Sequence, residues 1–455
     1  MGRDLALLIP EIAVLLTAVG ALIAEMLRRP RAALAVAVIG LLVATGLTLR
    51  LVGGTETTVF GGSFRIDGLS VWAKLVLLPA TALSILLARV DVAGTAREGT
   101  VYSLLCFATL GALALAGAGD IMFLVLGTLL TGLATFALVA YPDTDPATEA
   151  AMKFFVFASV TTAIMIFGLT YWFGAAGSTL LADLPGMDTM PMAIILGFAA
   201  VIVGLGYKAS LVPFHFWAPD AYEGAPLSIA AYLSVVPKVG ALFALAQVVR
   251  DMPPESGWTA VIAGLAVLSM TYGYLAALVQ ENVIRLLAYS SIAQSGYFLL
   301  GIVAVGSSEL ALPSIILFAA AYAAMNLGAF AVAAATGRTL NDFGGLGRAR
   351  PLMGIAMVVF LLSLVGIPPL AGFVGKFLLF AAAIDVQFTW LAVVAIVNSV
   401  LSLAVYLRII VPMYRRGEAA TSAAGAWPGI VVVITLSATL IIGLFAEFLL
   451  GQPMV

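Results

Sequence analysis

The lysines of this chain are the residues whose type and placement point most directly to chemistry. The chain has five: Lys74, Lys153, Lys208, Lys238 and Lys376. All of them fall inside or at the edge of apolar segments, whereas the polar connections use arginine. Arginine stays protonated at any accessible pH, but a lysine removed from water can lose its proton near neutrality. A lysine in the membrane interior costs roughly 2.5–3.5 kcal/mol on insertion scales, so it normally faces a partner or a wet cavity. Titratable cations placed in this way are what a proton relay requires.

Two of the lysines have a simpler interpretation. Lys74 has the alternative of extending its ammonium group from a helix end toward the membrane surface. Lys153 follows Glu149 by four residues, which is the spacing of an ion pair on a helix surface, so Lys153 and Glu149 are only auxiliary candidates for a relay. The other lysines lie well inside their apolar segments and are expected to form the relay: Lys208, Lys238 and Lys376.

Proline and glycine interrupt two apolar segments close to a lysine. The first interruption covers residues 206–213 and contains Pro213, and the second covers 366–376 and contains Pro368 and Pro369. Proline removes a backbone donor, and in a membrane the freed carbonyl groups need protein or water beside them. Paired broken helices in corresponding halves are typical of inverted-repeat transporters, with the binding site at the breaks.

Two further residues near these breaks are candidates. Pro237 directly precedes Lys238 and predicts a break or loosening in a third helix. His215 is the only histidine, and its titration range suits proton transfer. Because His215 lies past the first break in a segment rich in aromatic residues, a structural hydrogen-bonding role is an equal alternative.

The elements that must position these residues are helices. Apolar runs between breakers predict about fourteen membrane-spanning helices. Their expected bounds are 5–27, 33–52, 67–88, 100–118, 120–141, 150–173, 191–212, 226–249, 257–279, 284–305, 310–336, 352–381, 389–413 and 427–450. The runs are too long and too unalternating for a closed barrel.

We therefore expect an all-α integral membrane protein with a single membrane domain over residues 1–455. Its expected parts are N-terminal helices 1–3 (1–90), a first repeat of spans 4–8 (100–250), a second repeat of spans 9–13 (257–415) and a last helix (427–450). The two five-helix repeats are expected to be inverted, with spans 7 and 12 as the broken helices.

Composition excludes several classes of function. Hydrophobic residues make up 63% of the chain and charged residues 10%, which a soluble domain of this length could not accommodate. The single Cys106 and single His215 argue against an internal disulfide and a His/Cys metal site. The sequence contains no phosphate-binding loop, no dinucleotide-type glycine motif and no basic cluster typical of nucleic-acid binding.

The distribution of arginine predicts the orientation in the membrane. Connections after odd-numbered spans carry many arginines: Arg28, Arg29, Arg31, Arg89, Arg97, Arg285, Arg338, Arg348, Arg350, Arg415 and Arg416. Connections after even-numbered spans carry only Arg50, Arg65 and Arg250. The positive-inside rule places the first group in the cytoplasm. Both termini are then expected on the other side, which is the periplasm for a multi-pass protein of a bacterial inner membrane.

Several segments resemble a known family. They are Lys208–Pro226 (KASLVPFHFWAPDAYEGAP), Arg285–Ile292 (RLLAYSSI), Met325–Phe330 (MNLGAF), Gly366–Phe377 (GIPPLAGFVGKF) and Tyr406–Arg408 (YLR). Together they resemble the antiporter-like, proton-translocating subunits of respiratory complex I, the NADH:quinone oxidoreductase, over almost the whole chain. The N-type branch is favoured, because M-type members have glutamate at the position of Lys376 and L-type members add a long lateral helix after the fourteenth span.

The resemblance implies roles for the relay lysines. Lys208 resembles the lysine of the family's seventh helix, whose proton affinity a neighbouring acid adjusts. Lys238 resembles the central lysine of the eighth helix, and Lys376 the lysine near the exit side of the twelfth. The resemblance also implies that no cofactor or metal binds in this chain. NADH, FMN, iron–sulfur clusters and quinone would belong to partner subunits of the complex. The expected neighbours are other antiporter-like and small membrane-arm subunits and the lipid bilayer.

The sequence departs from the family at the acid that should accompany Lys208. The family has glutamate in the fifth helix, where this chain has Leu129 in Leu126–Leu130 (LGTLL). Gln294 replaces a frequent histidine and is an auxiliary candidate, and Ile284 replaces a frequent lysine. No acidic residue lies in the middle of spans 4–13 to compensate. We therefore expect Lys208 to be neutral at rest, with either a reduced relay or a silent first half-channel.

Other functions share these motifs. The first alternative is a subunit of a multi-subunit cation/proton antiporter or of a membrane-bound hydrogenase. The second is a structural membrane-arm subunit that has lost conduction. The leucine at position 129 favours this alternative, and the retained relay lysines argue against it. A solute carrier is disfavoured because the spans hold no substrate-sized set of polar residues.

Overall fold

The computed structural model describes residues 2–187, 191–253, 256–415 and 425–446. Within these ranges, twelve helices are long and apolar enough to cross a membrane. They are α2 (Ile9–Met26), α3 (Pro30–Leu49), α4 (Gly68–Val92), α5 (Glu98–Ala116), α6 (Ile121–Ala140), α7 (Asp145–Ala176), α10 (Leu227–Arg250), α11 (Trp258–Ala277), α12 (Val283–Val303), α13 (Ala311–Thr336), α17 (Thr389–Tyr414) and α18 (Ala426–Leu444). The all-helical membrane architecture predicted from the sequence is confirmed.

Shorter elements connect these helices or continue them. The short α-helices are α1 (Gly2–Leu7), α8 (Pro191–Lys208), α9 (Trp217–Gly224), α14 (Leu346–Ala349), α15 (Pro351–Val365) and α16 (Ala371–Asp385). Single 3-10 turns cover Phe60–Gly62, Leu181–Met187 and Leu340–Phe343. Strands β1 (Thr57–Val59) and β2 (Phe64–Ile66) form an antiparallel hairpin that pairs Thr57 with Ile66.

The breaks expected in spans 7 and 12 are present in the backbone. Helix α8 ends at Lys208, and the chain resumes as a helix only in α9. The span expected over 352–381 is not one helix but two, α15 and α16, separated by residues 366–370. The first expected span is also divided, because α1 ends at Leu7 before α2 begins. The total of about fourteen spans and the inversion of the two repeats stay predictions.

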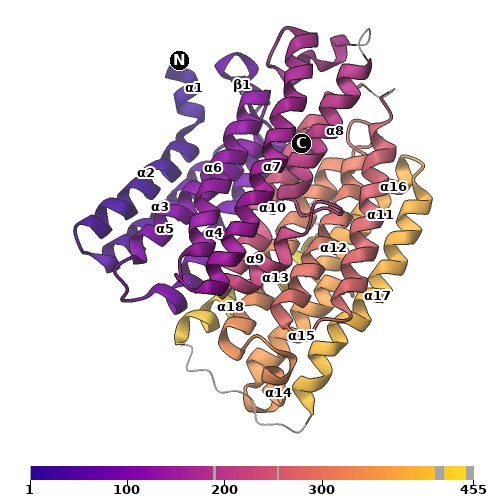
Figure 1. The fold of residues 1–455 in the computed structure, drawn as a ribbon. Helices are drawn as coiled ribbons and strands as arrows, with labels where there is room; N and C mark the ends of the chain where they lie inside the picture. Colours follow the sequence, from indigo (N-terminus) through magenta and orange to yellow (C-terminus); the bar gives the residue numbers. More distant parts are fainter. Residues whose placement is uncertain (1, 188–190, 254–255, 416–424, 447–455) are drawn as a thin grey trace.

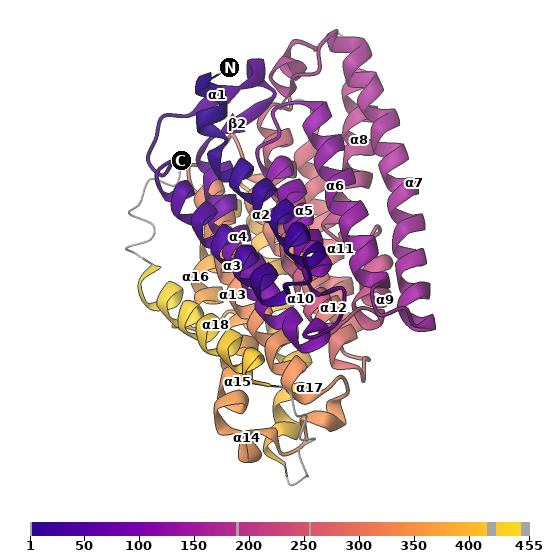
Figure 2. The same cartoon turned by 90° about the vertical axis from the view of Figure 1, so that its left-hand side faces the viewer.

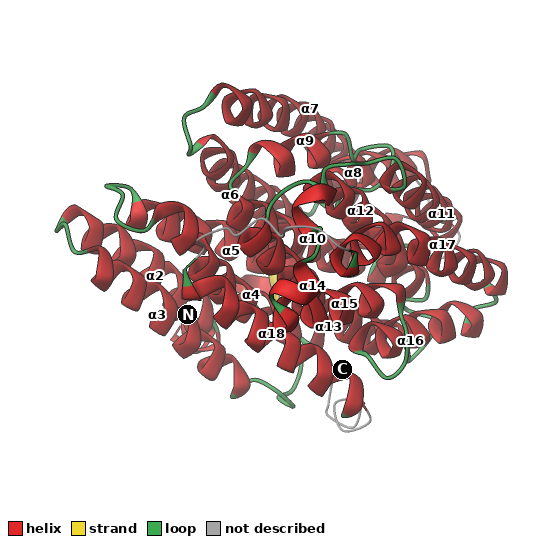
Figure 3. Cartoon of the chain, turned by 90° about the horizontal axis from the view of Figure 1, so that it is seen from below, coloured by secondary structure: helices red, strands yellow, loops and turns green. Residues whose placement is uncertain are grey.

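The most enclosed helices run through the middle of the molecule. Almost every residue of α10, α12 and α13 is buried, whereas only a third or less of α2, α3 and α18 is buried. Figure 1 shows α2 and α3 at one side and α16 and α17 at the other. Seen from below in Figure 3, α10, α12 and α13 lie between these two edges. A view turned by 90° shows α7 and α8 standing together at a further edge (Figure 2). The buried polar side chains described below converge on the enclosed helices.

Glycine allows α5 and α6 to approach each other closely. A Cβ atom on Gly111 would lie 2.5 Å from Thr131 Oγ1 and 2.6 Å from the Thr131 backbone nitrogen. A Cβ atom on Gly127 would lie 2.8 Å from the Gly111 carbonyl oxygen. Small residues at such crossings permit backbone contact between membrane helices, which is how they associate without a hydrophobic driving force.

We expect Gly111→Ala to lower the thermal unfolding midpoint of the detergent-solubilised protein, because overpacking a tight contact costs about 1–3 kcal/mol. The matched control is Gly46→Ala in α3, where an added Cβ atom meets nothing within 4 Å. The control should be neutral or slightly stabilising. Equal shifts in the two variants would show that the α5–α6 contact does not depend on glycine.

Candidate functional site

The three lysines expected to form a relay are buried and come from three different helices. Lys208 is the last residue of α8, Lys238 lies in the middle of α10, and Lys376 lies in the second turn of α16. Their exposed fractions are only 1%, 1% and 2%. Among the described residues, none of the three forms an ion pair with a carboxylate. Each is therefore accommodated by a different kind of contact.

Lys238 contacts a hydroxyl group on α12. Its Nζ donates a hydrogen bond to Ser291 Oγ over 2.8 Å. The ammonium also lies 5.9 Å from the centre of the Tyr222 ring, within reach of a cation–π interaction. A hydroxyl both accepts and donates protons, so Ser291 is suited to exchange a proton with Lys238.

Lys376 sits against the end of a broken helix. Its Nζ donates to the carbonyl oxygens of Leu364 (2.9 Å) and Val365 (3.2 Å) and to Ser399 Oγ (3.3 Å). The Tyr297 ring centre lies 3.8 Å from the same nitrogen. Because α15 ends at Val365, its last carbonyl groups have no partner within the helix and carry its partial negative charge. The break that contains Pro368 and Pro369 thus exposes the oxygens that hold this lysine.

Gln294 connects the surroundings of Lys238 with those of Lys376. Its Nε2 donates to the same Leu364 carbonyl (3.0 Å), to the Tyr274 hydroxyl (3.1 Å) and, at 3.4 Å, to the Tyr406 hydroxyl. The Tyr406 hydroxyl is in turn hydrogen-bonded to Ser290 Oγ, 2.6 Å away. Ser290 directly precedes Ser291, the partner of Lys238. Polar groups of the enclosed helices therefore extend toward each other from the two lysines. The described hydrogen bonds form two clusters, one of Lys238 with Ser291 and one of Lys376, Gln294, Tyr406 and Ser290, which meet at the neighbouring residues Ser290 and Ser291. The sequence-based candidate Gln294 belongs to the second cluster.

Lys208 faces a cavity of about 290 Å³ between α6 and α7. The cavity is also lined by Leu129, Thr128 and Gly132 of α6, and a Cβ atom on Gly132 would lie 3.4 Å from Lys208 Nζ. Leu129, identified from the sequence as standing in place of an acid, thus lies on the same cavity as the lysine. No hydrogen bond or ion pair joins Lys208 to any described residue, and Thr128 Oγ1 is likewise without a described partner.

Lys74 pairs with an acid that the sequence-based reasoning did not use. Its Nζ lies 2.9 Å from Glu11 Oε1, with exposed side-chain fractions of 1% and 12%. The alternative that Lys74 extends to the membrane surface is therefore wrong. The available signal was that both residues interrupt apolar segments with opposite charges, and a buried charge normally requires such a partner. The pairing itself depends on α2 and α4 both packing on α3 and α5, which the sequence does not reveal.

Lys153 and Glu149 form the surface ion pair that their spacing predicts. Their charged atoms lie 2.7 Å apart, and their side chains are 49% and 68% exposed. Lys153 also forms an ion pair with Asp220 of α9 (3.0 Å). Arg285 of α12 in turn forms ion pairs with Asp220 (2.8 Å) and with Glu223 (2.7 Å). Burial raises the pKa of Asp220, but the hydrogen bonds from Arg285 and Lys153 outweigh it and hold that pKa below its usual value of 3.8. This cluster fastens α7, α9 and α12 to one another and does not contact the relay lysines.

His215 lies in the segment between α8 and α9 and is 2% exposed. Its ring is packed between those of Phe216 and Tyr272, whose centres are 4.5 and 4.8 Å away. Its Nδ1 has no hydrogen-bond partner among the described residues, so the expected structural hydrogen bond is not seen at this atom. Pro213 lies in the same non-helical segment.

The break expected at Pro237 is wrong, because α10 continues without interruption from Leu227 to Arg250. Neighbouring side chains hold α10 at this point. The Tyr322 hydroxyl of α13 donates to the Ser234 carbonyl (2.8 Å), and Asn326 Nδ2 donates to Ser234 Oγ (2.6 Å). Both contacts lie next to Leu233, whose carbonyl Pro237 leaves without its helical donor, and they brace α10 against α13.

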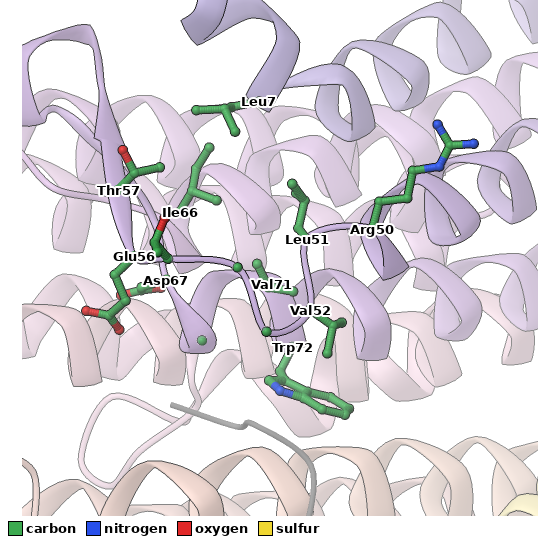
Figure 4. Close-up of a pocket in the computed structure, with 14 residues that line it drawn as sticks. Leu7, Arg50, Leu51, Val52, Glu56, Thr57, Ile66, Asp67, Val71 and Trp72 are labelled. Carbon is green, nitrogen blue, oxygen red and sulfur yellow. The ribbon is translucent and has the colours of Figure 1, made fainter.

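A separate pocket of about 170 Å³ lies near the N-terminal elements. Figure 4 shows Glu56 and Asp67 on one side of it and Arg50 on the other. Asp67 accepts hydrogen bonds from Arg250 (2.6 Å) and Gln247 (2.9 Å), which ties α4 to the end of α10. None of the five lysines lines this pocket, so it is not part of the relay site.

Comparisons with known proteins show what the whole chain is similar to. Residues 118–402 match the model of a family described as NADH:quinone oxidoreductase/Mrp antiporter, transmembrane. Subunit N 1 of the NADH-quinone oxidoreductase of Streptomyces griseus is 39% identical over 470 residues, which cover 99% of this chain and 98% of the relative. Subunit N of the F(420)H(2) dehydrogenase of Methanosarcina mazei is 38% identical over 83% of this chain and 82% of its own length. A chain of respiratory complex I from Thermus thermophilus superposes with a TM-score of 0.86 and 30% identity, covering 97% and 98% of the two chains.

We expect Glu11→Gln to destabilise the protein by about 3 kcal/mol, because removing one partner leaves a buried charge without compensation. The double variant Glu11→Leu with Lys74→Met should recover most of this loss. Both are measured as the free energy of unfolding in detergent micelles. The matched control is Glu149→Gln at the exposed Lys153 pair, which should leave that free energy unchanged. A loss that persists in the double variant would contradict an electrostatic cause.

Proposed function

This chain belongs to the NADH:quinone oxidoreductase/Mrp antiporter family, and from that premise we propose that it is a proton-translocating, antiporter-like membrane subunit of N type in an NADH:quinone oxidoreductase complex. The observation that carries the proposal is the pair of adjacent polar clusters around Lys238 and Lys376 inside the enclosed helices. Such buried titratable groups have no evident structural purpose, because an apolar core would hold these helices together at lower cost.

The surroundings of the two lysines suggest the direction of transfer. Lys238 has one described hydrogen-bond acceptor, a hydroxyl group. Lys376 has three acceptors, two of them at the negative end of a helix, and an aromatic face as well. A proton that reaches Lys238 is therefore drawn toward Lys376, and the hydroxyl groups of Ser290, Ser291 and Tyr406 between them can each accept and donate.

The oxidoreductase chemistry is proposed to belong to partner subunits. The relatives are named as single subunits of larger complexes, and their donors differ, since one complex oxidises NADH and the other F(420)H(2). The role of this chain is thus separable from the donor. We propose that NADH, FMN, iron–sulfur clusters and quinone bind elsewhere in the complex. Quinone reduction would then reach this chain as a change in electric field that acts on the lysines through neighbouring membrane-arm subunits.

The proposed orientation places the arginine-rich connections in the cytoplasm of a bacterium, with both termini in the periplasm. The residues that line two cavities indicate that several of these connections lie at the same end of the molecule. Arg28 and Thr95 line one cavity, and Thr95, Arg97 and Arg338 line another. The connections after α2, α4 and α13 therefore gather at one end of the molecule. Arg50 and Asp67 line a pocket that shares no residue with either cavity.

We expect Lys238→Met to lower both proton pumping and electron transfer at least about tenfold in membrane vesicles that contain the assembled complex, because a relay loses its central proton-transfer group. Lys153→Met, at an exposed surface pair, should leave both rates unchanged. Assembly is checked by the amount of chain that copurifies with the complex. Intact pumping in an assembled Lys238→Met complex would favour a structural subunit that has lost conduction.

We expect Tyr406→Phe to slow proton pumping by a smaller factor, because it removes the hydroxyl that joins Ser290 to Gln294 and leaves the ring in place. The matched control is Tyr414→Phe, near the exposed end of the same helix. Both variants are compared by initial pumping rate and by the solvent isotope effect on that rate. If the two variants behave alike, protons do not pass along this hydroxyl series.

A further inference from the structure

Lys208 differs from the other two relay lysines, because the described residues offer its ammonium group no hydrogen-bond acceptor, whereas Lys238 and Lys376 both have acceptors. Lys208 is 1% exposed and has neither a hydrogen bond nor an ion pair among the described residues. Lys74, which is equally buried, pairs with Glu11 instead. A buried lysine without acceptors is unfavourable, so an acceptor that approaches from outside this chain is the expected complement.

The cavity that Lys208 faces is open to the outer surface of the molecule. Two leucines of α6 and two residues of α7 line it with exposed side chains: Leu129 (43%), Leu133 (64%), Phe155 (44%) and Ile166 (39%). The residues that line the cavity include no acid. Besides Lys208, they include Thr128, whose buried Oγ1 has no described partner. An apolar rim around two unsatisfied polar groups is thus available to a neighbouring molecule.

The depth of this cavity decides which kind of neighbour can reach it. Leu129 lies eight residues after the start of α6 at Ile121, which is about 12 Å along the helix axis. A hydrocarbon core of about 30 Å has its middle about 15 Å from either edge. The phosphate of a lipid headgroup lies outside that core and cannot contact Lys208. A carboxyl group on a membrane-spanning segment can lie at this depth.

We propose that the α6–α7 cavity receives a carboxyl side chain from a membrane-spanning helix of a neighbouring subunit, which pairs with Lys208 in place of the acid absent at Leu129. The proposal deepens the proposed function and rests on it for the existence of neighbouring subunits. The charge of Lys208, the hydroxyl of Thr128 and the apolar rim together specify the partner as an apolar helix that carries one Asp or Glu. The first half of the relay is then completed at a subunit interface.

The first test is photo-cross-linking in membranes that contain the native complex. Benzoylphenylalanine is introduced at Leu133 and, in a second variant, at Ile166, so that two rim positions on different helices report independently. Val397 of α17, which is 63% exposed, serves as the control position. Both rim positions should capture a membrane-spanning peptide of a neighbouring subunit with an Asp or Glu within one helical turn of the cross-link. Capture of lipid alone, of an acid-free segment, or of no polypeptide would overturn the proposal.

The second test exchanges the charges. Lys208→Glu should lower the amount of chain retained in the purified complex about tenfold, because it opposes two like charges at a desolvated contact. Changing the captured acid to lysine in the same strain should restore retention. A failure of the exchange to restore it would overturn the proposal.

The results of the cross-linking and charge-exchange tests are independent of the pumping measurements, because the Lys238→Met variant does not alter this cavity. Restored retention together with intact pumping in Lys238→Met would reject the proposed function and keep the interface. Loss of pumping in Lys238→Met without restored retention would keep the proposed function and reject the interface.

Discussion

An ammonium group inside a membrane protein needs acceptors within hydrogen-bond distance, and this requirement organises the whole molecule. Water and headgroups are too far away to supply them at mid-membrane depth. Lys74 obtains a carboxylate from another helix, Lys238 a hydroxyl group, and Lys376 the carbonyl oxygens at a helix end. The helices that hold these acceptors must be kept in register to within a few tenths of an ångström. The tight, glycine-mediated packing of α5 on α6 and the complete enclosure of α10 meet the same need for rigidity.

Backbone breaks are one source of such acceptors. In a continuous helix each internal carbonyl group already accepts a helical hydrogen bond, so the carbonyl groups at a helix end are the ones most available to a cation. By ending at Val365, α15 releases carbonyl oxygens that Lys376 and Gln294 then share. The proline-rich segment that follows is therefore part of the site rather than a simple connection. Pro237 shows the opposite case, since α13 donates two hydrogen bonds to nearby Ser234 and α10 remains a continuous support for Lys238.

The two halves of the relay are unequal. Ser290, Tyr406 and Gln294 lie between the contacts of Lys238 and those of Lys376, whereas Lys208 opens onto a surface cavity beside Leu129. Leu129, at the position where the family resemblance implies an acid, offers Lys208 no counter-charge and makes the cavity wall apolar. With leucine at this position, a counter-charge for the Lys208 ammonium group has to come from outside the chain, through the surface cavity. This asymmetry gives the chain a reason to act only within an assembly.

The sequence by itself determined the class of the protein, its helical content and the identity of the buried lysines. These follow from the length of the apolar runs and from the high cost of each interior charge, both of which are local properties. The spacing of Glu149 and Lys153 likewise fixed their pairing, because four residues complete about one helical turn. The break at 366–370 was visible in its prolines for the same reason.

Only the tertiary structure decided which groups meet across helices. The pairing of Glu11 with Lys74 joins residues far apart in sequence, and it depends on how α2 and α4 both pack on α3 and α5, which apolar helices do not encode in their hydrophobicity. The same holds for the contact of Tyr406 with Gln294, and for that of Tyr322 with Ser234 near Pro237. All faces of a membrane helix are apolar, so the sequence pattern that reveals a buried face in a soluble protein is absent here. Neighbours, and therefore acceptors, are set by three-dimensional packing.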